Sequence, residues 1–110
     1  MVTVCMLTQN GRPAGFEVTG HAGCSAYGRD IVCSAVSAIA QTALLGLTDV
    51  LGLPVRHQSE AGRLYCGTTG LSAAQSRDAA LILNTMLAGL EAILMNEEYQ
   101  QYLSITQREV

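Results

Sequence analysis

The sequence predicts an α+β fold of two layers, in which two helices pack on one face of a mixed, roughly five-stranded sheet. Two observations carry this prediction. Short segments in which apolar residues alternate with other residues occur at both ends and in the middle of the chain, and two long segments repeat apolar residues every three or four positions. Their order is β-β-α-β-β-α-β, and one layer of helices on one sheet face would bury both helical stripes. At 110 residues, we expect one domain over residues 1–110.

The first two strands are predicted as a hairpin. Apolar residues alternate through residues 2–7 and again through 14–19, and Asn10-Gly11 between them is a dipeptide suited to tight turns with positive φ. Pro13 lacks an amide donor, which predicts that at least one of the two strands lies near a sheet edge. The second strand leads directly into His21.

The first helix is predicted to start at Asp30, whose carboxylate would cap the open amides of the first turn. Apolar residues then recur at helical spacing up to Leu51, and Gly52 and Pro54 end the helix. The second half of the chain predicts two short strands over residues 55–59 and 63–67, a helix over about 72–97 and a closing strand over 101–109. His57, on the first of these strands, is expected to face solvent.

Composition excludes several classes of protein. The chain is 49% hydrophobic and 14% charged, which is too apolar for a disordered chain. Its net charge is −3 and its arginines form no basic stripe, so we expect no direct nucleic-acid binding. The uncharged run of residues 31–48 has polar residues at helical spacing and no flanking anchors, which predicts a buried helix and no membrane contact. No signal peptide is recognised, so the protein is expected to be cytoplasmic, with its four cysteines as thiols.

Two residues point to chemistry. Cys33 is predicted to be the third residue after the Asp30 cap, where open amides and the helix dipole favour a thiolate. His21 stands at a strand end and is joined to this helix by a short glycine-bearing segment, so the two side chains are expected to meet. A thiolate beside an imidazolium attacks carbonyl carbon. The alternative is that Cys33 only packs, as most buried cysteines do, and that His21 is an ordinary surface or core residue.

Two motifs resemble a known family. Gly20-His21-Ala22-Gly23 and the run from Gly28 to Ser37, GRDIVCSAVS, resemble the signature of the ribosomal-processing cysteine proteases called Prp. The resemblance implies a small cytoplasmic bacterial protease domain, homodimeric and without a cofactor. Such a protease removes the short N-terminal extension of a large-subunit ribosomal protein, cutting after an aromatic residue. His21 and Cys33 would be its catalytic dyad, and the loop between them would move when substrate binds.

Other motif positions are expected to support the dyad or bind substrate. Ser37 lies four residues after Cys33 and therefore on the same helix face, and the oxyanion is expected at the amides of the first helical turn, including that of Cys33. A serine there can also simply bond back to a helix carbonyl. The supporting positions are Gly20, Gly23, Tyr27, Gly28, Asp30, Ser34 and Ser37.

A second reading of the same residues is a non-catalytic binding module. His21, Cys24 and Cys33 would then hold zinc, or the chain would be a dimeric partner of a ribosomal protein without cleaving it. The spacing of these residues matches no familiar zinc motif, and the family resemblance implies no metal. Cys24 is therefore expected to be a loop cysteine near the active site, able to pair with Cys33 on oxidation.

Overall fold

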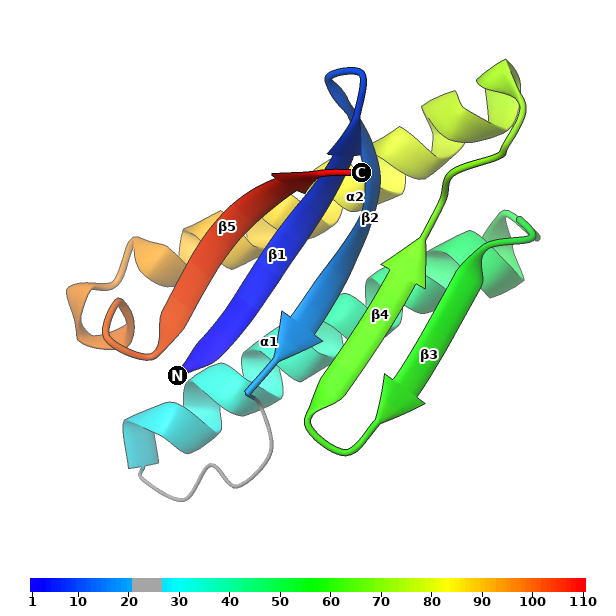
Figure 1. Ribbon diagram of the computed structural model, residues 1–110. Helices are drawn as coiled ribbons and strands as arrows, with labels where there is room; N and C mark the ends of the chain where they lie inside the picture. The colour runs from blue at the N-terminus through cyan, green and yellow to red at the C-terminus, as the bar shows by residue number, and fades with distance from the viewer. Residues whose placement is uncertain (21–26) are drawn as a thin grey trace.

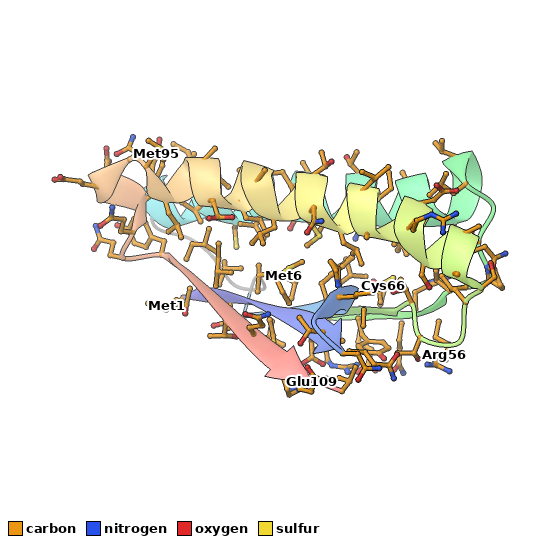
Figure 2. All side chains as sticks on the ribbon, turned by 90° about the horizontal axis from the view of Figure 1, so that it is seen from above. Met1, Met6, Arg56, Cys66, Met95 and Glu109 are labelled. Atoms are coloured by element: carbon orange, nitrogen blue, oxygen red, sulfur yellow. The ribbon has the colours of Figure 1, made fainter. Side chains whose placement is uncertain are left out.

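The structure is a computed structural model that describes residues 1–20 and 27–110. It has one five-stranded sheet in the order β3-β4-β2-β1-β5, with two long helices packed on one face (Figures 1 and 2). The strands are β1 (Val2–Gln9), β2 (Arg12–Thr19), β3 (Arg56–Glu60), β4 (Arg63–Gly67) and β5 (Leu103–Glu109), and the helices are α1 (Tyr27–Leu45) and α2 (Ala73–Leu94). A π-helical turn, η1 (Gly46–Val50), continues α1, and a 3-10 turn, η2 (Glu97–Tyr99), follows α2. The predicted two-layer architecture is confirmed.

The sheet is mixed because β5 runs parallel to β1 whereas the other neighbouring strands are antiparallel. The prediction drawn from Pro13 is wrong, since β1 and β2 both lie inside the sheet. Pro13 is tolerated because β4 pairs with β2 only from Gly15 to Thr19, and because the register with β1 shifts between Leu7 and Thr8. A missing amide donor there breaks no regular ladder bond to β4.

The core lies between the sheet and the helices. Val4, Phe16 and Leu83 are almost fully buried there, and Met6 and Cys66 point from the sheet toward the helices (Figure 2). The two helices approach each other closely at small residues: a Cβ added at Gly46 would stand 3.2 Å from the Ile82 side chain. The alanine and glycine content of the helices therefore permits their close packing.

The helical segment Asp30–Val50 is long and apolar enough, by composition, to cross a membrane, with a mean hydropathy of 1.8. A core helix meets the same criterion, and this one buries Val32, Val36 and Ala40 against the sheet. The buried face of this segment packs the fold, whereas Leu45 and Val50 near its end are exposed.

The N-terminus of the second helix, α2, is capped by side chains. Ser72 accepts a hydrogen bond from the amide of Gln75, and the Gln75 side chain accepts one from the amide of Ser72, which forms a capping box. The helix ends at Leu94, three residues before the predicted boundary. Asn96 explains the difference, because its side chain accepts from the amide of Glu98 and starts the separate turn η2.

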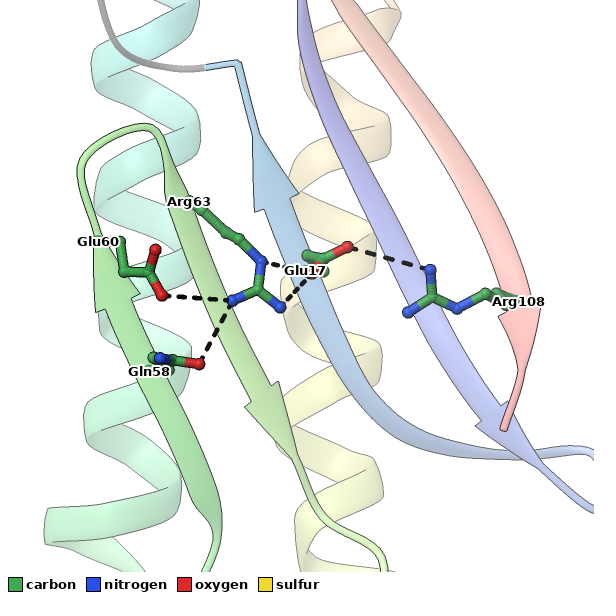
Figure 3. A network of polar contacts seen from close by, with 5 residues as sticks. All are labelled: Glu17, Gln58, Glu60, Arg63 and Arg108. Carbon is green, nitrogen blue, oxygen red and sulfur yellow. Dashed lines mark hydrogen bonds and ion pairs between the residues drawn. The ribbon is translucent and has the colours of Figure 1, made fainter.

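The sheet face opposite the helices carries a network of charged side chains centred on Glu17 (Figure 3). Arg63 donates to Glu17 Oε2 from Nε at 2.8 Å and lies 2.6 Å from it through Nη2. Arg108 lies 4.0 Å from the other carboxylate oxygen. The network ties β4, β2 and β5 together across the part of the sheet that no described helix covers.

Candidate active site

The end of β2 is held in place by two neighbours. Gly20 N–H donates to the carbonyl oxygen of Gly62, at an N···O distance of 3.2 Å, in the turn between β3 and β4. Gly20 has a φ of +78°, and a Cβ added there would lie closer than 3.0 Å to the carbonyl oxygen of Met1. Only glycine meets both conditions without strain. The residue directly before His21 is therefore packed between the start of β1 and the β3–β4 turn.

Neither neighbour of Gly20 is recognisable from the sequence. The predicted strands over residues 55–59 and 63–67 imply a turn at 60–62, but no local signal indicates which strand end this turn meets. Met1 takes part only through its backbone. His21, Gly23 and Cys24 themselves lie outside the described residues. Figure 1 shows that β2 ends and α1 begins at the same end of the molecule, where the N-terminus also lies.

The predicted role of Asp30 as N-cap is wrong. Helix α1 begins at Tyr27, so Asp30 is the fourth helical residue, and its side chain is exposed. An acidic side chain is favourable inside the first turn as well as at the cap, because both positions face the positive end of the helix dipole. Asp30 therefore marks the first turn of the helix but not its first residue.

This shift changes the surroundings of Cys33. Cys33 is the seventh residue of α1 and is 7% exposed, among the core residues. Only the first four amides of a helix lack an intrahelical acceptor, so the Cys33 amide is not among the open donors. The first four amides of α1 are those of residues 27–30, and the position of the oxyanion site stays a prediction. Because the dipole effect falls off within the first turn, the helix start stabilises a thiolate at Cys33 less than the sequence predicts.

The supporting serines divide into two positions. Ser37 is half-buried one turn after Cys33 on the same face of α1, as predicted, whereas Ser34 is exposed beside it. Tyr27 and Gly28 form the first residues of α1. The side chain of Tyr27 lies outside the described part of the structure.

The three described cysteines are in two states, disulfide-bonded and free. Cys33 takes part in a disulfide bond, so the expectation that it is a free thiol is wrong for this structure. The expectation holds for Cys5 and Cys66, which are free. The sequence indicates only whether the protein's surroundings are expected to be oxidising or reducing. Whether a disulfide bond forms also depends on which sulfur atoms the fold brings together. A reduced Cys33 is required for any nucleophilic role.

Cys66 is unsuited to act as a nucleophile. It is fully buried between the sheet and the helices, and this burial raises the pKa of its thiol from 9.0 to about 11. At neutral pH its thiolate is about 100-fold rarer than that of an ordinary cysteine, because two pKa units correspond to that factor. Cys5 is half-buried on the sheet face opposite the helices. Cys33 lies on α1, which begins at the end of the molecule where β2 ends.

Residues 1–20 and 27–110 contain no cluster of three or more histidine, cysteine, aspartate or glutamate side chains placed to hold an ion. Two members of the predicted zinc alternative, His21 and Cys24, lie outside these ranges. His57 lies exposed on β3, as expected.

Proteins similar to this chain are found both by sequence and by fold. A curated relative, the ribosomal processing cysteine protease Prp of Staphylococcus aureus, is 29% identical over 109 residues, which are 96% of this chain and 97% of the relative. The solved structure of SMU.848 from Streptococcus mutans superposes with a TM-score of 0.85 at 21% identity, covering 100% of this chain and 99% of that one.

A further solved structure is the S. aureus ribosomal processing protease Prp in complex with a covalently linked product peptide. It has a TM-score of 0.73 and 25% identity, and covers 98% of this chain and 100% of that one. The family model described as cysteine protease Prp matches residues 1–104. Since this match spans nearly the whole chain, the chain belongs to the cysteine protease Prp family and is a cysteine protease.

Proposed function

We propose that this protease removes the short N-terminal extension of a bacterial large-subunit ribosomal protein, with Cys33 as nucleophile and His21 as general acid and base. The observation that carries the proposal is the position of Cys33 on α1, at the end of the molecule where β2 leads into His21 through Gly20. The name of the S. aureus relative supports ribosomal processing, and its covalently linked product peptide supports a covalent mechanism.

The proposed reaction has two steps. The Cys33 thiolate attacks the scissile carbonyl carbon, and the protonated His21 gives its proton to the leaving amine, so that a thioester forms and the C-terminal product departs. Water then gives a proton to His21 and attacks the thioester carbonyl, which releases the N-terminal product and the thiol. The open amides of residues 27–30 are the nearest set of helix donors for the oxyanion.

The redox state of Cys33 is part of the proposal. A sulfur in a disulfide carries no thiolate, so the active form is the reduced one. We expect activity to require a thiol reductant such as dithiothreitol when the protein has been purified in air. This requirement distinguishes a cysteine nucleophile from any mechanism that does not use a thiol.

Cleavage of the ribosomal precursor tests the proposal. The reduced protein is incubated with the precursor carrying its N-terminal extension, and product is measured by mass spectrometry for the wild type, Cys33→Ala and His21→Ala. Cys5→Ala is the matched control, because Cys5 is a free cysteine on the opposite sheet face. We expect both active-site variants to lose at least about 10³-fold in rate and the control to keep its rate. Equal cleavage by Cys33→Ala would overturn the assignment.

We also propose that the protein is a cytoplasmic homodimer. Between α1 and α2 lies an apolar groove of about 520 Å³, lined among others by Leu45, Val50 and Ile82. Leu45 is 53% exposed and Val50 79%, which is surface that a second copy would cover. Light scattering is expected to give twice the chain mass for the wild type and a monomer for Val50→Glu. A monomeric wild type would contradict the proposal.

A further inference from the structure

A second cavity, far along the molecule from Cys33, has a polar lining. It has a volume of about 390 Å³ and lies where the tip of the β1–β2 hairpin meets the segment between β4 and α2. Arg12, Thr68, Thr69 and Ser76 are among its lining residues. The proposed protease chemistry uses none of them, so the cavity needs a separate explanation.

The first side of this cavity is the N-terminus of α2, a helix of 22 residues. The capping box satisfies the amides of Ser72 and Gln75, and the Ser76 amide donates to the carbonyl of Ser72. Among the described residues, no acceptor reaches the amides of Ala73 and Ala74. A long helix with open amides carries partial positive charge at this end and favours an anion.

Positively charged side chains gather at the same place. Arg12 lines the cavity, and the Arg56 guanidinium donates a hydrogen bond to Thr69 Oγ1 on its wall. Arg77 lines the adjoining groove, which shares Arg12 with the cavity. Half of the six arginines thus lie around this cavity in a chain whose net charge is −3.

The nearby carboxylates leave this charge only partly balanced. Asp78 lines the adjoining groove with Arg77. Glu109 is engaged by Thr8, whose hydroxyl donates to it at 2.9 Å, and by the Asn10 amide, also at 2.9 Å. Neither carboxylate forms an ion pair with Arg12 or Arg56 within the described residues.

Thr68 indicates a ligand in this cavity independently of the helix N-terminus and the arginines. It is 5% exposed and is the only buried polar or charged residue within the described ranges, and it lines the cavity. Its amide donates to the Ala14 carbonyl, but no described residue forms a hydrogen bond with its hydroxyl. Buried hydroxyls are normally paired because an unpaired one lowers stability. A ligand oxygen in the cavity would give this hydroxyl its partner.

We propose that this cavity binds a phosphate group, held by Arg12, the Thr68 hydroxyl and the start of α2. The positive side chains and open amides favour an anion. A phosphate group has several oxygens that accept hydrogen bonds, so it can bond to the amides and to the Thr68 hydroxyl together. The group can arrive as inorganic phosphate or as part of a small phosphorylated molecule, since the shared chemistry is the phosphate itself. This inference is independent of the proposed protease residues.

Titration of the full chain with inorganic phosphate tests the proposal, followed through backbone amide shifts in nuclear magnetic resonance. We expect saturable shifts at Thr68, Ala73 and Ala74, absent with sodium chloride at the same ionic strength. Arg12→Gln and Thr68→Val should each weaken the affinity about tenfold, the effect of losing one charge-assisted or buried hydrogen bond. Arg108→Gln is the matched control, since Arg108 lies on β5 near Glu17.

The results of the titration either support the phosphate site or overturn it. A nucleoside triphosphate that binds more tightly than phosphate would identify a carried phosphate group as the ligand, and equal binding would identify free phosphate. Shifts that sodium chloride reproduces, or that remain unchanged in both Arg12→Gln and Thr68→Val, would overturn the proposal. Thr68→Val is nearly isosteric, and its folding is checked by its thermal unfolding. Weakened binding in Arg12→Gln alone would also count against the buried hydroxyl as a ligand.

Discussion

Replacing Gly20 by alanine tests whether the end of β2 positions His21, the proposed general acid and base. Gly20 and Gly11 have nearly the same backbone conformation, with φ of +78° and +77°. A Cβ at Gly11 meets nothing within 4 Å, whereas one at Gly20 would lie closer than 3.0 Å to the Met1 carbonyl oxygen. Gly11→Ala therefore carries only the left-handed backbone cost, and Gly20→Ala adds the collision.

The magnitudes follow from this comparison. The left-handed conformation costs an alanine about 1–2 kcal/mol at either position. The collision adds about 1–3 kcal/mol, which is typical of inserting a methyl group into packed surroundings. Removing the collision requires the Met1 or the Gly20 segment to move by roughly 1 Å, and a displacement of about 1 Å at a catalytic group lowers activity about 10²-fold. We expect this loss in Gly20→Ala and less than about a twofold change in Gly11→Ala.

Peptide cleavage and urea denaturation of both variants provide the assay. A third protein, Gly20→Ala that begins at Val2, lacks the Met1 carbonyl and should recover most of the activity while keeping the backbone cost. Mass spectrometry verifies each N-terminus. The reasoning is refuted if Gly20→Ala is as active as Gly11→Ala, or if loss of Met1 leaves the activity of Gly20→Ala unchanged.

Three further predictions concern stability. The folded protein holds the Cys66 proton more tightly than the unfolded chain does, because burial raises the pKa of the thiol from 9.0 to about 11. The resulting contribution to the free energy of unfolding is complete below pH 9.0 and is lost as the pH rises to about 11. In urea titrations, the stability of the wild type should therefore fall over this range by up to about 2–3 kcal/mol more than that of Cys66→Val. Glu17→Gln should destabilise the fold by about 1 kcal/mol, because it weakens the charge-assisted bonds from Arg63, and a loss that does not shrink at high salt would contradict this cause. Ser72→Ala should cost about 1 kcal/mol in thermal or urea unfolding through loss of the capping box with Gln75, whereas an unchanged stability would show that the cap contributes nothing.

The candidate site was only partly predictable from the chain. The resemblance to the family motifs implies that Cys33 and His21 form a pair, whereas the argument from the helix start depends on where the helix begins. Local signals leave that boundary uncertain, since Asp30 is equally suitable as a cap and inside the first turn. The helix starts four residues earlier than predicted, which moves Cys33 from the third helical position to the seventh, in the second turn, and weakens the physical argument for its activation.

The sequence by itself determined the order of the elements, the hairpin at Asn10-Gly11 and the two helices, because these depend on local periodicity and turn chemistry. It also determined the family, through motifs that are contiguous in the chain. Only the tertiary structure decided that β1 and β2 lie inside the sheet, and that Met1 and Gly62 enclose Gly20. It also decided that Thr68, whose hydroxyl has no hydrogen-bond partner among the described residues, lines a cavity. These features join segments far apart in sequence, and no local pattern records which segments the burial of apolar surface will bring together.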